Sequence, residues 1–143
     1  LAPSAELVKE GNVKGYKHDP NNESVVGRLV FGTFTMMLTG DAEKKEEQAI
    51  LAGGSANVQS KILKSGHHGS KTSSSADFLR AVKPEAALIS CGVNNDYGHP
   101  HKETMKKYHA LNIPIYVTAE NGTITVTSDG KTYKITPERG EKQ

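Results

Sequence analysis

Apolar residues along the chain follow two spacings: short β-branched runs, and longer stretches in which they recur every three or four positions. The short runs predict strands, and the longer stretches predict helices that cover a sheet. Glycine, proline and serine residues between them indicate where each element begins or ends. The expected strands lie at 5–9, 24–31, 34–38, 60–64, 86–91, 113–118, 123–127 and 131–135, and the expected helices at 42–51, 76–83 and 100–112.

Turn and cap residues support these limits. The Gly-Thr pair at 32–33 predicts a hairpin turn, and Asn-Gly at 121–122 and Asp-Gly at 129–130 predict two more. Pro100 is expected as the first residue of the third helix, where a missing N–H group costs little. The alternation of strands and helices predicts a mixed α/β sheet with functional loops at the carboxyl ends of its strands.

Composition narrows the class of protein. The 143 residues suit one domain, and no apolar run approaches the length of about 18 residues that a membrane span needs, so we expect this domain to be soluble. A formal net charge of +2 is too small for a strongly basic protein that coats nucleic acid. The chain begins at Leu1 without a signal-peptide pattern, and we expect it to be part of a longer protein.

The cysteine and histidine counts direct attention to imidazole chemistry. A single cysteine, Cys91, excludes an internal disulfide framework and a multi-thiolate zinc site, and its place on an apolar strand favours a core residue over a nucleophile. Six histidines are therefore the candidate metal ligands.

Polar residues that suit metal chemistry follow three of the expected strands. Asp41 follows the strand at 34–38, a Gly-His-His-Gly-Ser segment at 66–70 follows the strand at 60–64, and a Tyr-Gly-His-Pro-His segment at 97–101 follows the next strand. If these strands lie together in one sheet, one carboxylate and up to four imidazoles meet at one edge. This set suits one or two divalent cations, because an aspartate can bridge two ions and neutral imidazoles complete the shell.

Each residue also has a structural interpretation. Asp41 would serve as the N-cap of the helix at 42–51. The sequence around His67 and His68 favours a functional role over a structural one, because the two residues are adjacent, flanked by glycines and outside any amphipathic pattern. His99 is either a site residue or a cap-like surface residue.

The residues around the double histidine also have two interpretations. His101 is either a site residue or an exposed residue of the first helical turn. Lys61, Lys64 and Lys71 surround the double histidine, and Ser70 precedes further hydroxyl residues at a helix start. They indicate either a phosphate cradle or a solvated face with a serine cap.

Four motifs taken together resemble the carboxyl-terminal half of a metallo-β-lactamase-fold domain of the ComEC competence type, over about residues 21–133. The motifs are Asn21-Asn22-Glu23-Ser24-Val25-Val26, Leu38-Thr39-Gly40-Asp41-Ala42, the stretch from Leu63 to Ser75, and the stretch from Asn94 to His101. The resemblance implies an αββα sandwich with a metal site at one edge of two facing sheets. It also implies two divalent cations, zinc or manganese, in the complete domain.

The resemblance assigns roles to individual residues. In the family, the aspartate at the position of Asp41 bridges the metals, and His67 matches a late histidine ligand. The expected site residues are Asp41 and His68 for catalysis, Asp41, His67 and His99 for metal binding, and Ser70, Lys71 and His101 for substrate binding. Two cations held there would activate water and neutralise the charge that develops on a phosphodiester under attack.

The implied function is phosphodiester hydrolysis, as a nuclease linked to DNA uptake. The family's first metal-binding motif, His-x-His-x-Asp-His, is absent from these residues, so the chain is expected to be the carboxyl-terminal part of one domain over 1–136, with a tail at 137–143. By itself it should bind metal weakly and be inactive. The alternatives are a free-standing hydrolase of small esters or phosphoesters and a catalytically silent interaction module.

The resemblance also implies partners. They are DNA or another phosphodiester, the amino-terminal half of the same domain, and the membrane channel domain of a parent protein at the bacterial cell membrane. Half of a sandwich would expose one apolar sheet face, which predicts self-association or a retained partner segment.

Overall fold

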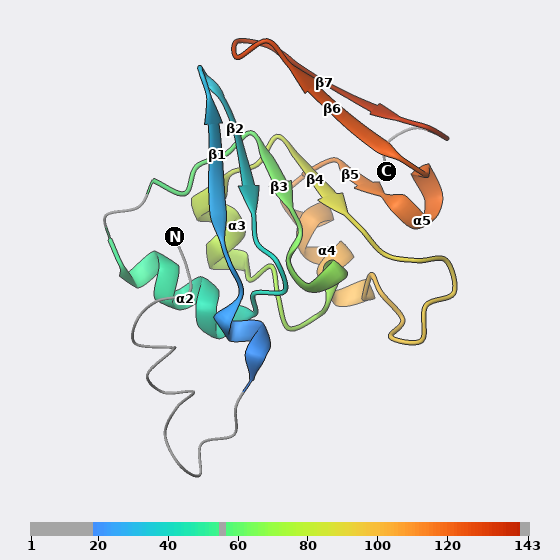
Figure 1. The fold of residues 1–143 in the computed structure, drawn as a ribbon. Coiled ribbons are helices and arrows are strands. Elements are labelled where there is room, and N and C mark those ends of the chain that lie inside the picture. Colours follow the sequence, from blue (N-terminus) through green and yellow to red (C-terminus); the bar gives the residue numbers. More distant parts are fainter. Residues whose placement is uncertain (1–18, 55–56, 141–143) are drawn as a thin grey trace.

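The structure is a computed structural model, and it describes residues 19–54 and 57–140 (Figure 1). The strand expected at 5–9 lies outside the described residues. The elements in chain order are η1 (Pro20–Glu23), β1 (Gly27–Phe31), β2 (Phe34–Leu38), α2 (Lys44–Ala52), β3 (Ile62–Lys64), η2 (Gly66–Gly69), α3 (Ala76–Val82), β4 (Ala86–Ile89), α4 (Lys102–Ala110), β5 (Ile115–Val117), α5 (Thr118–Asn121), β6 (Ile124–Ser128) and β7 (Tyr133–Pro137).

The main sheet has five strands in the order β1-β2-β3-β4-β5. The β1–β2 pair is an antiparallel hairpin, with Phe31 opposite Phe34, and β2 to β5 are all parallel. Helices connect the parallel strands, because such strands need a long crossover. The expectation of a mixed α/β sheet is confirmed, and β2, β3 and β4 end at the same edge.

The helices pack on one face of this sheet. Met37, Leu63 and Ala87 stand next to one another across β2, β3 and β4 and belong to the largest core cluster. Phe78 of α3 and Tyr108 of α4 are fully buried in that cluster. Burial of several such side chains, each contributing about 1.5–3 kcal/mol, holds the helices to the sheet.

The β6–β7 hairpin covers part of the opposite face. Phe34, Ile62 and Leu88 form a second core cluster, and Tyr133 of the hairpin packs against Phe34 with ring centroids 5.6 Å apart. In Figure 1 the hairpin is a separate two-stranded unit above β4 and β5.

The β1 side of the sheet carries exposed apolar residues. Leu29 is 45% exposed, Phe31 53% and Leu38 41%. A surface of this kind is where a further part of a larger fold, or another chain, is expected to pack. No helix in the described part of the chain is long and apolar enough to cross a membrane.

Two helix starts differ from the sequence expectation. Helix α2 begins at Lys44 with Glu43 at its N-cap, so the expectation that Asp41 caps this helix is wrong. Helix α4 begins at Lys102 with His101 at its N-cap, so Pro100 precedes the helix. In both places, hydrogen bonds to neighbouring loops occupy the residues that the local pattern assigned to the first turn.

The hairpin expected at Asn121-Gly122 is also wrong. Asn121 closes α5, and its Oδ1 atom accepts the Val117 N–H at 2.8 Å. The chain then leaves the main sheet, and β6 pairs with β7 instead of β5. The turn at Asp129-Gly130 is confirmed, and β7 continues through Pro137.

Gly69 provides a test of the close packing beside η2. Its φ is +80°, and an added Cβ would lie 2.8 Å from Pro100 Cβ, whereas Gly98 has φ +69° and open space around it. Both alanine variants are strained at positive φ, but only Gly69→Ala also clashes. Urea denaturation should show Gly69→Ala to be less stable than Gly98→Ala by about 1–3 kcal/mol. Equal losses would contradict the packing.

Candidate metal centre

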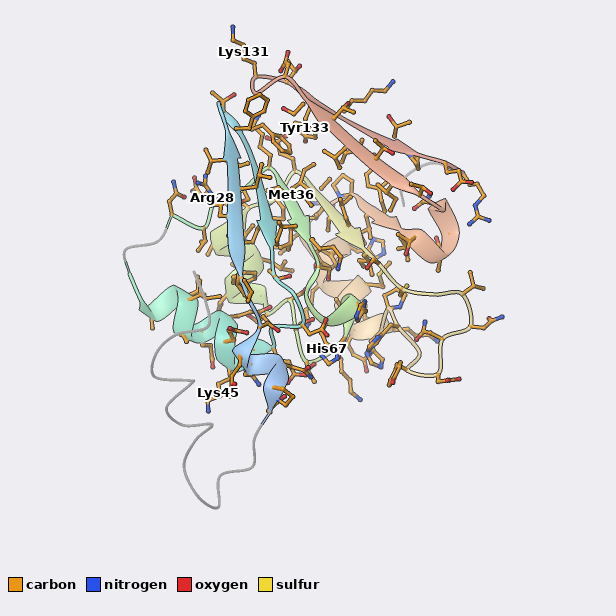
Figure 2. All side chains as sticks on the ribbon, viewed as in Figure 1. Arg28, Met36, Lys45, His67, Lys131 and Tyr133 are labelled. Carbon is orange, nitrogen blue, oxygen red and sulfur yellow. The ribbon has the colours of Figure 1, made fainter. Side chains whose placement is uncertain are left out.

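The three polar segments meet at the carboxyl edge of β2, β3 and β4, as the sequence predicted. Figure 2 shows His67 at that end of the sheet, opposite the end that carries Lys131. The ring of His99 lies 5.6 Å from that of His67, 6.2 Å from that of His68 and 4.8 Å from that of His101. We call this group of four histidines with Asp41 the rim.

The double histidine has an unusual backbone. His67 and His68 have φ values of 45° and 53°, in the left-handed region that residues other than glycine seldom adopt. Gly66 has no room for a side chain, since a Cβ there would lie 2.8 Å from the Ala42 carbonyl oxygen. Strained conformations of this kind persist where the surrounding structure enforces them, and they cluster at functional sites.

His67 is held by a residue that the sequence analysis missed. Its Nδ1 atom lies 3.0 Å from Glu43 Oε1, which also accepts the Thr72 hydroxyl at 2.7 Å. Because a carboxylate accepts hydrogen bonds, Nδ1 carries the proton, and Nε2 of the neutral ring keeps its lone pair.

His68 has the same tautomer for a different reason. Its Nδ1 atom donates to the Ser90 carbonyl at 2.7 Å, so Nε2 of the neutral ring keeps its lone pair. That Nε2 lies 3.4 Å from Asp41 Oδ1. When the ring is neutral, these are two facing acceptors, an arrangement that a cation between them would stabilise. The structure thus pairs Asp41 with His68, and His67 with Glu43.

His99 and His101 complete the rim. Burial lowers the pKa of His99, and the neighbouring imidazoles lower it further, which favours the neutral form of this ring. His101 Nδ1 accepts the Lys71 N–H at 3.1 Å, so a neutral His101 carries its proton on Nε2. His101 therefore presents a hydrogen-bond donor, as an anion-binding residue requires.

The expected phosphate cradle is only partly assembled. Lys61 precedes β3 at the opposite edge of the sheet and pairs with Glu85 at 3.8 Å, so its assignment to the cradle is wrong. Lys64 is near the rim: burial lowers its pKa, and the charge of Asp41 opposes that shift. The Ser70 hydroxyl is buried and shares a 2.9 Å hydrogen bond with Thr72, whereas Lys71 is exposed.

A buried polar network anchors the segment that carries the double histidine. Tyr108 of α4 donates its hydroxyl to Ser65 Oγ at 2.9 Å and lies 3.0 Å from Ser74 Oγ, and burial raises its pKa to about 12. Glu47 of α2 accepts the N–H groups of Ser74 and Ser75 at 2.6 and 2.9 Å. The rim thus rests on two helices as well as on three strands, which local sequence patterns do not reveal.

Glu46 gives the fold a pH dependence. Its side chain is buried, and burial raises its pKa from 4.5 to about 7. Between these values the folded protein keeps a proton that the unfolded chain has released, so stability falls as pH rises. The side chain in Glu46→Gln cannot ionise. Over this interval the free energy of unfolding of this variant should therefore fall by about 3 kcal/mol less than that of the wild type, as measured by urea denaturation. Parallel pH profiles of the two proteins would contradict this assignment.

The donor set fits a divalent cation in its chemistry. Metal-binding histidines commonly donate their second ring N–H to a carboxylate or a carbonyl oxygen, as His67 and His68 do here. Within residues 19–54 and 57–140, no three histidine, cysteine, aspartate or glutamate side chains are grouped so that they could hold an ion by themselves.

Comparison with known proteins gives several similar sequences, and three of them are described below. The chain is 39% identical over 104 residues to ComE operon protein 3 of Bacillus subtilis, covering 73% of this chain. It is 39% identical over 106 residues, 74% of this chain, both to competence protein ComA of Neisseria gonorrhoeae and to recombination protein 2 of Haemophilus influenzae. The chain is similar to one segment of each of these proteins.

The similarity is confined to a small part of each of these relatives. The chain spans 13% of ComE operon protein 3, 15% of ComA and 13% of recombination protein 2. No protein-family model matches the chain, and no solved structure matches it.

Proposed function

We propose that this chain is the carboxyl-terminal half of a metallo-β-lactamase-like domain that hydrolyses phosphodiesters, as a nuclease linked to DNA uptake. The convergence of Asp41, His67, His68 and His99 at the ends of adjacent parallel strands carries the proposal. The similarity of the chain to competence proteins supports the link to DNA uptake.

Asp41 and His68 would share one cation. The observed separation of Asp41 Oδ1 and His68 Nε2 is 3.4 Å, close enough for both atoms to bind the same cation. His67 and His99 would supply further nitrogen ligands. Glu43 and the Ser90 carbonyl would fix the rings of His67 and His68 in the tautomer that binds metal.

The remaining ligands would come from outside this chain. We propose that an amino-terminal half supplies them and covers the apolar residues on the β1 side, among them Leu29 and Leu38. Leu38 lies at the end of β2, three residues before Asp41, so one packing event would complete both the core and the metal centre. We call the two halves together the assembled domain.

When bound, divalent cations at such a site activate water and neutralise phosphate charge. The chain's own contribution is to bind and orient the substrate. His101 would donate its Nε2 proton to a phosphate oxygen, and Lys71 beside it would attract the anion. Asp41 would help to hold the cations at the carboxyl edge of the sheet.

Reconstitution tests the proposal directly. The chain, the amino-terminal half and their mixture are assayed for bound zinc or manganese and for hydrolysis of bis(p-nitrophenyl) phosphate. The mixture should bind metal and hydrolyse the ester, and each half alone should do neither. A mixture that forms a stable complex without metal or activity would favour the interaction module, and an active chain by itself would contradict the half-domain proposal.

A further inference from the structure

Tyr97 is a large aromatic residue that has no role in the proposed metal centre. It is 77% exposed, although it lies on the same loop as the rim residue His99. Its ring lies 5.8 Å from the ring of His99 at an interplanar angle of 20°. An aromatic ring held in solvent adds little to the core, but it offers a flat surface to a ligand.

The loop that carries Tyr97 is fixed by one side chain. Asn95 Nδ2 donates to the carbonyl groups of Gly92 at 2.9 Å and of His99 at 2.7 Å, and Asn95 Oδ1 accepts the His99 N–H at 2.9 Å. Gly98 N–H also donates to the Asn95 carbonyl at 3.1 Å. The backbone that carries Tyr97 is therefore held in place before any ligand binds, which reduces the entropy cost of stacking.

Tyr97 extends a row of aromatic rings that leads to the metal centre. His99 is nearly parallel to Tyr97, and His68 is nearly parallel to His99, at 21° and 6.2 Å. His68 in turn faces Asp41. A planar group stacked on Tyr97 would thus lie at the outer end of this row, beside the residues that are proposed to bind a phosphodiester.

We propose that Tyr97 is a stacking platform for an unpaired nucleobase, so that the site takes single-stranded nucleic acid. This inference rests on the proposed function for the phosphodiester site and specifies its substrate class. Bases in a duplex are covered by their neighbours, whereas each base of a single strand can stack on an exposed ring. Such stacking contributes about 1–3 kcal/mol per base and tolerates any sequence.

The test is binding of two fluorescent oligomers of equal length at low salt with EDTA present, one oligothymidylate and one abasic. The full chain should bind oligothymidylate more tightly. Tyr97→Ala should weaken that binding by about 5- to 150-fold and leave abasic binding almost unchanged, because only the base stacks. Tyr97→Phe should retain the preference for bases. Phe31→Ala, which removes another exposed aromatic ring at the opposite edge of the sheet, should bind both oligomers as the wild type does.

Three results would overturn the stacking proposal. They are no measurable binding of oligothymidylate, equal wild-type affinity for the two oligomers, and equal losses for both in Tyr97→Ala. Hydrolysis of bis(p-nitrophenyl) phosphate by the assembled domain is measured separately, with metal present. Because binding in EDTA needs no catalysis, failure of stacking and failure of the proposed hydrolysis are distinguishable.

Discussion

Asp41→Asn is expected to lower metal-dependent phosphodiester hydrolysis by the assembled domain by about 100-fold or more. The substitution preserves the size of the side chain but removes the charge that faces His68 Nε2 at 3.4 Å. An amide is a poorer ligand for a divalent cation, and loss of one preorganised electrostatic group costs about 100- to 1,000-fold in rate. Hydrolysis of bis(p-nitrophenyl) phosphate and metal content are the measurements.

The matched control is Asp129→Asn. Asp129 lies in the β6–β7 turn, at the end of the molecule that carries Lys131 in Figure 2, and an asparagine can keep its hydrogen bonds to the turn. Its rate and metal content should match those of the wild type. If Asp41→Asn also keeps the wild-type rate and metal content, Asp41 is not a metal ligand.

Glu47→Ala is expected to lower the free energy of unfolding by about 3–5 kcal/mol. The buried carboxylate accepts the N–H groups of Ser74 and Ser75, and its removal leaves two donors without a partner, at about 1–3 kcal/mol each, together with a cavity. Burial raises the pKa of Glu47, and these hydrogen bonds oppose the shift. Urea denaturation is the measurement.

Glu47→Gln separates the hydrogen bonds from the volume of the side chain. The amide oxygen can accept one of the two N–H groups, so the loss should be about half of that for Glu47→Ala. Equal stability of Glu47→Ala and the wild type would show that Glu47 does not anchor the segment after the double histidine.

The sequence predicted the place of the site because strand ends are local features. Asp41, the double histidine and His99 each follow an apolar run, and parallel strands bring such positions to one edge. The position of a residue before or after its strand also explains why the assignment of Lys61 to the phosphate cradle is wrong. Lys61 precedes β3 and Lys64 is its last residue, so the two lysines lie at opposite edges of the sheet although they are close in sequence.

Other features depend on tertiary contacts that no local pattern contains. Glu43 reaches His67 only because η2 and the residues just before α2, which are distant in sequence, lie against each other. The Asn121-Gly122 pair is typical of a hairpin turn, but Asn121 instead bonds to Val117, and β6 crosses to the other face of the sheet. The ring tautomers likewise follow from Ser90 and Glu43, which are distant in sequence from the histidines that they hold.

Proton NMR of the histidine rings during titration of the assembled domain with Mn²⁺, a paramagnetic ion, tests the central claim most directly. A cation at the carboxyl edge should broaden the signals of His67, His68 and His99 at the lowest metal concentrations and leave exposed His109 of α4 sharp. Asp41→Asn should need far more manganese for the same broadening. Equal broadening of His109 and the other three histidines, or none at all, would contradict a metal centre at this edge.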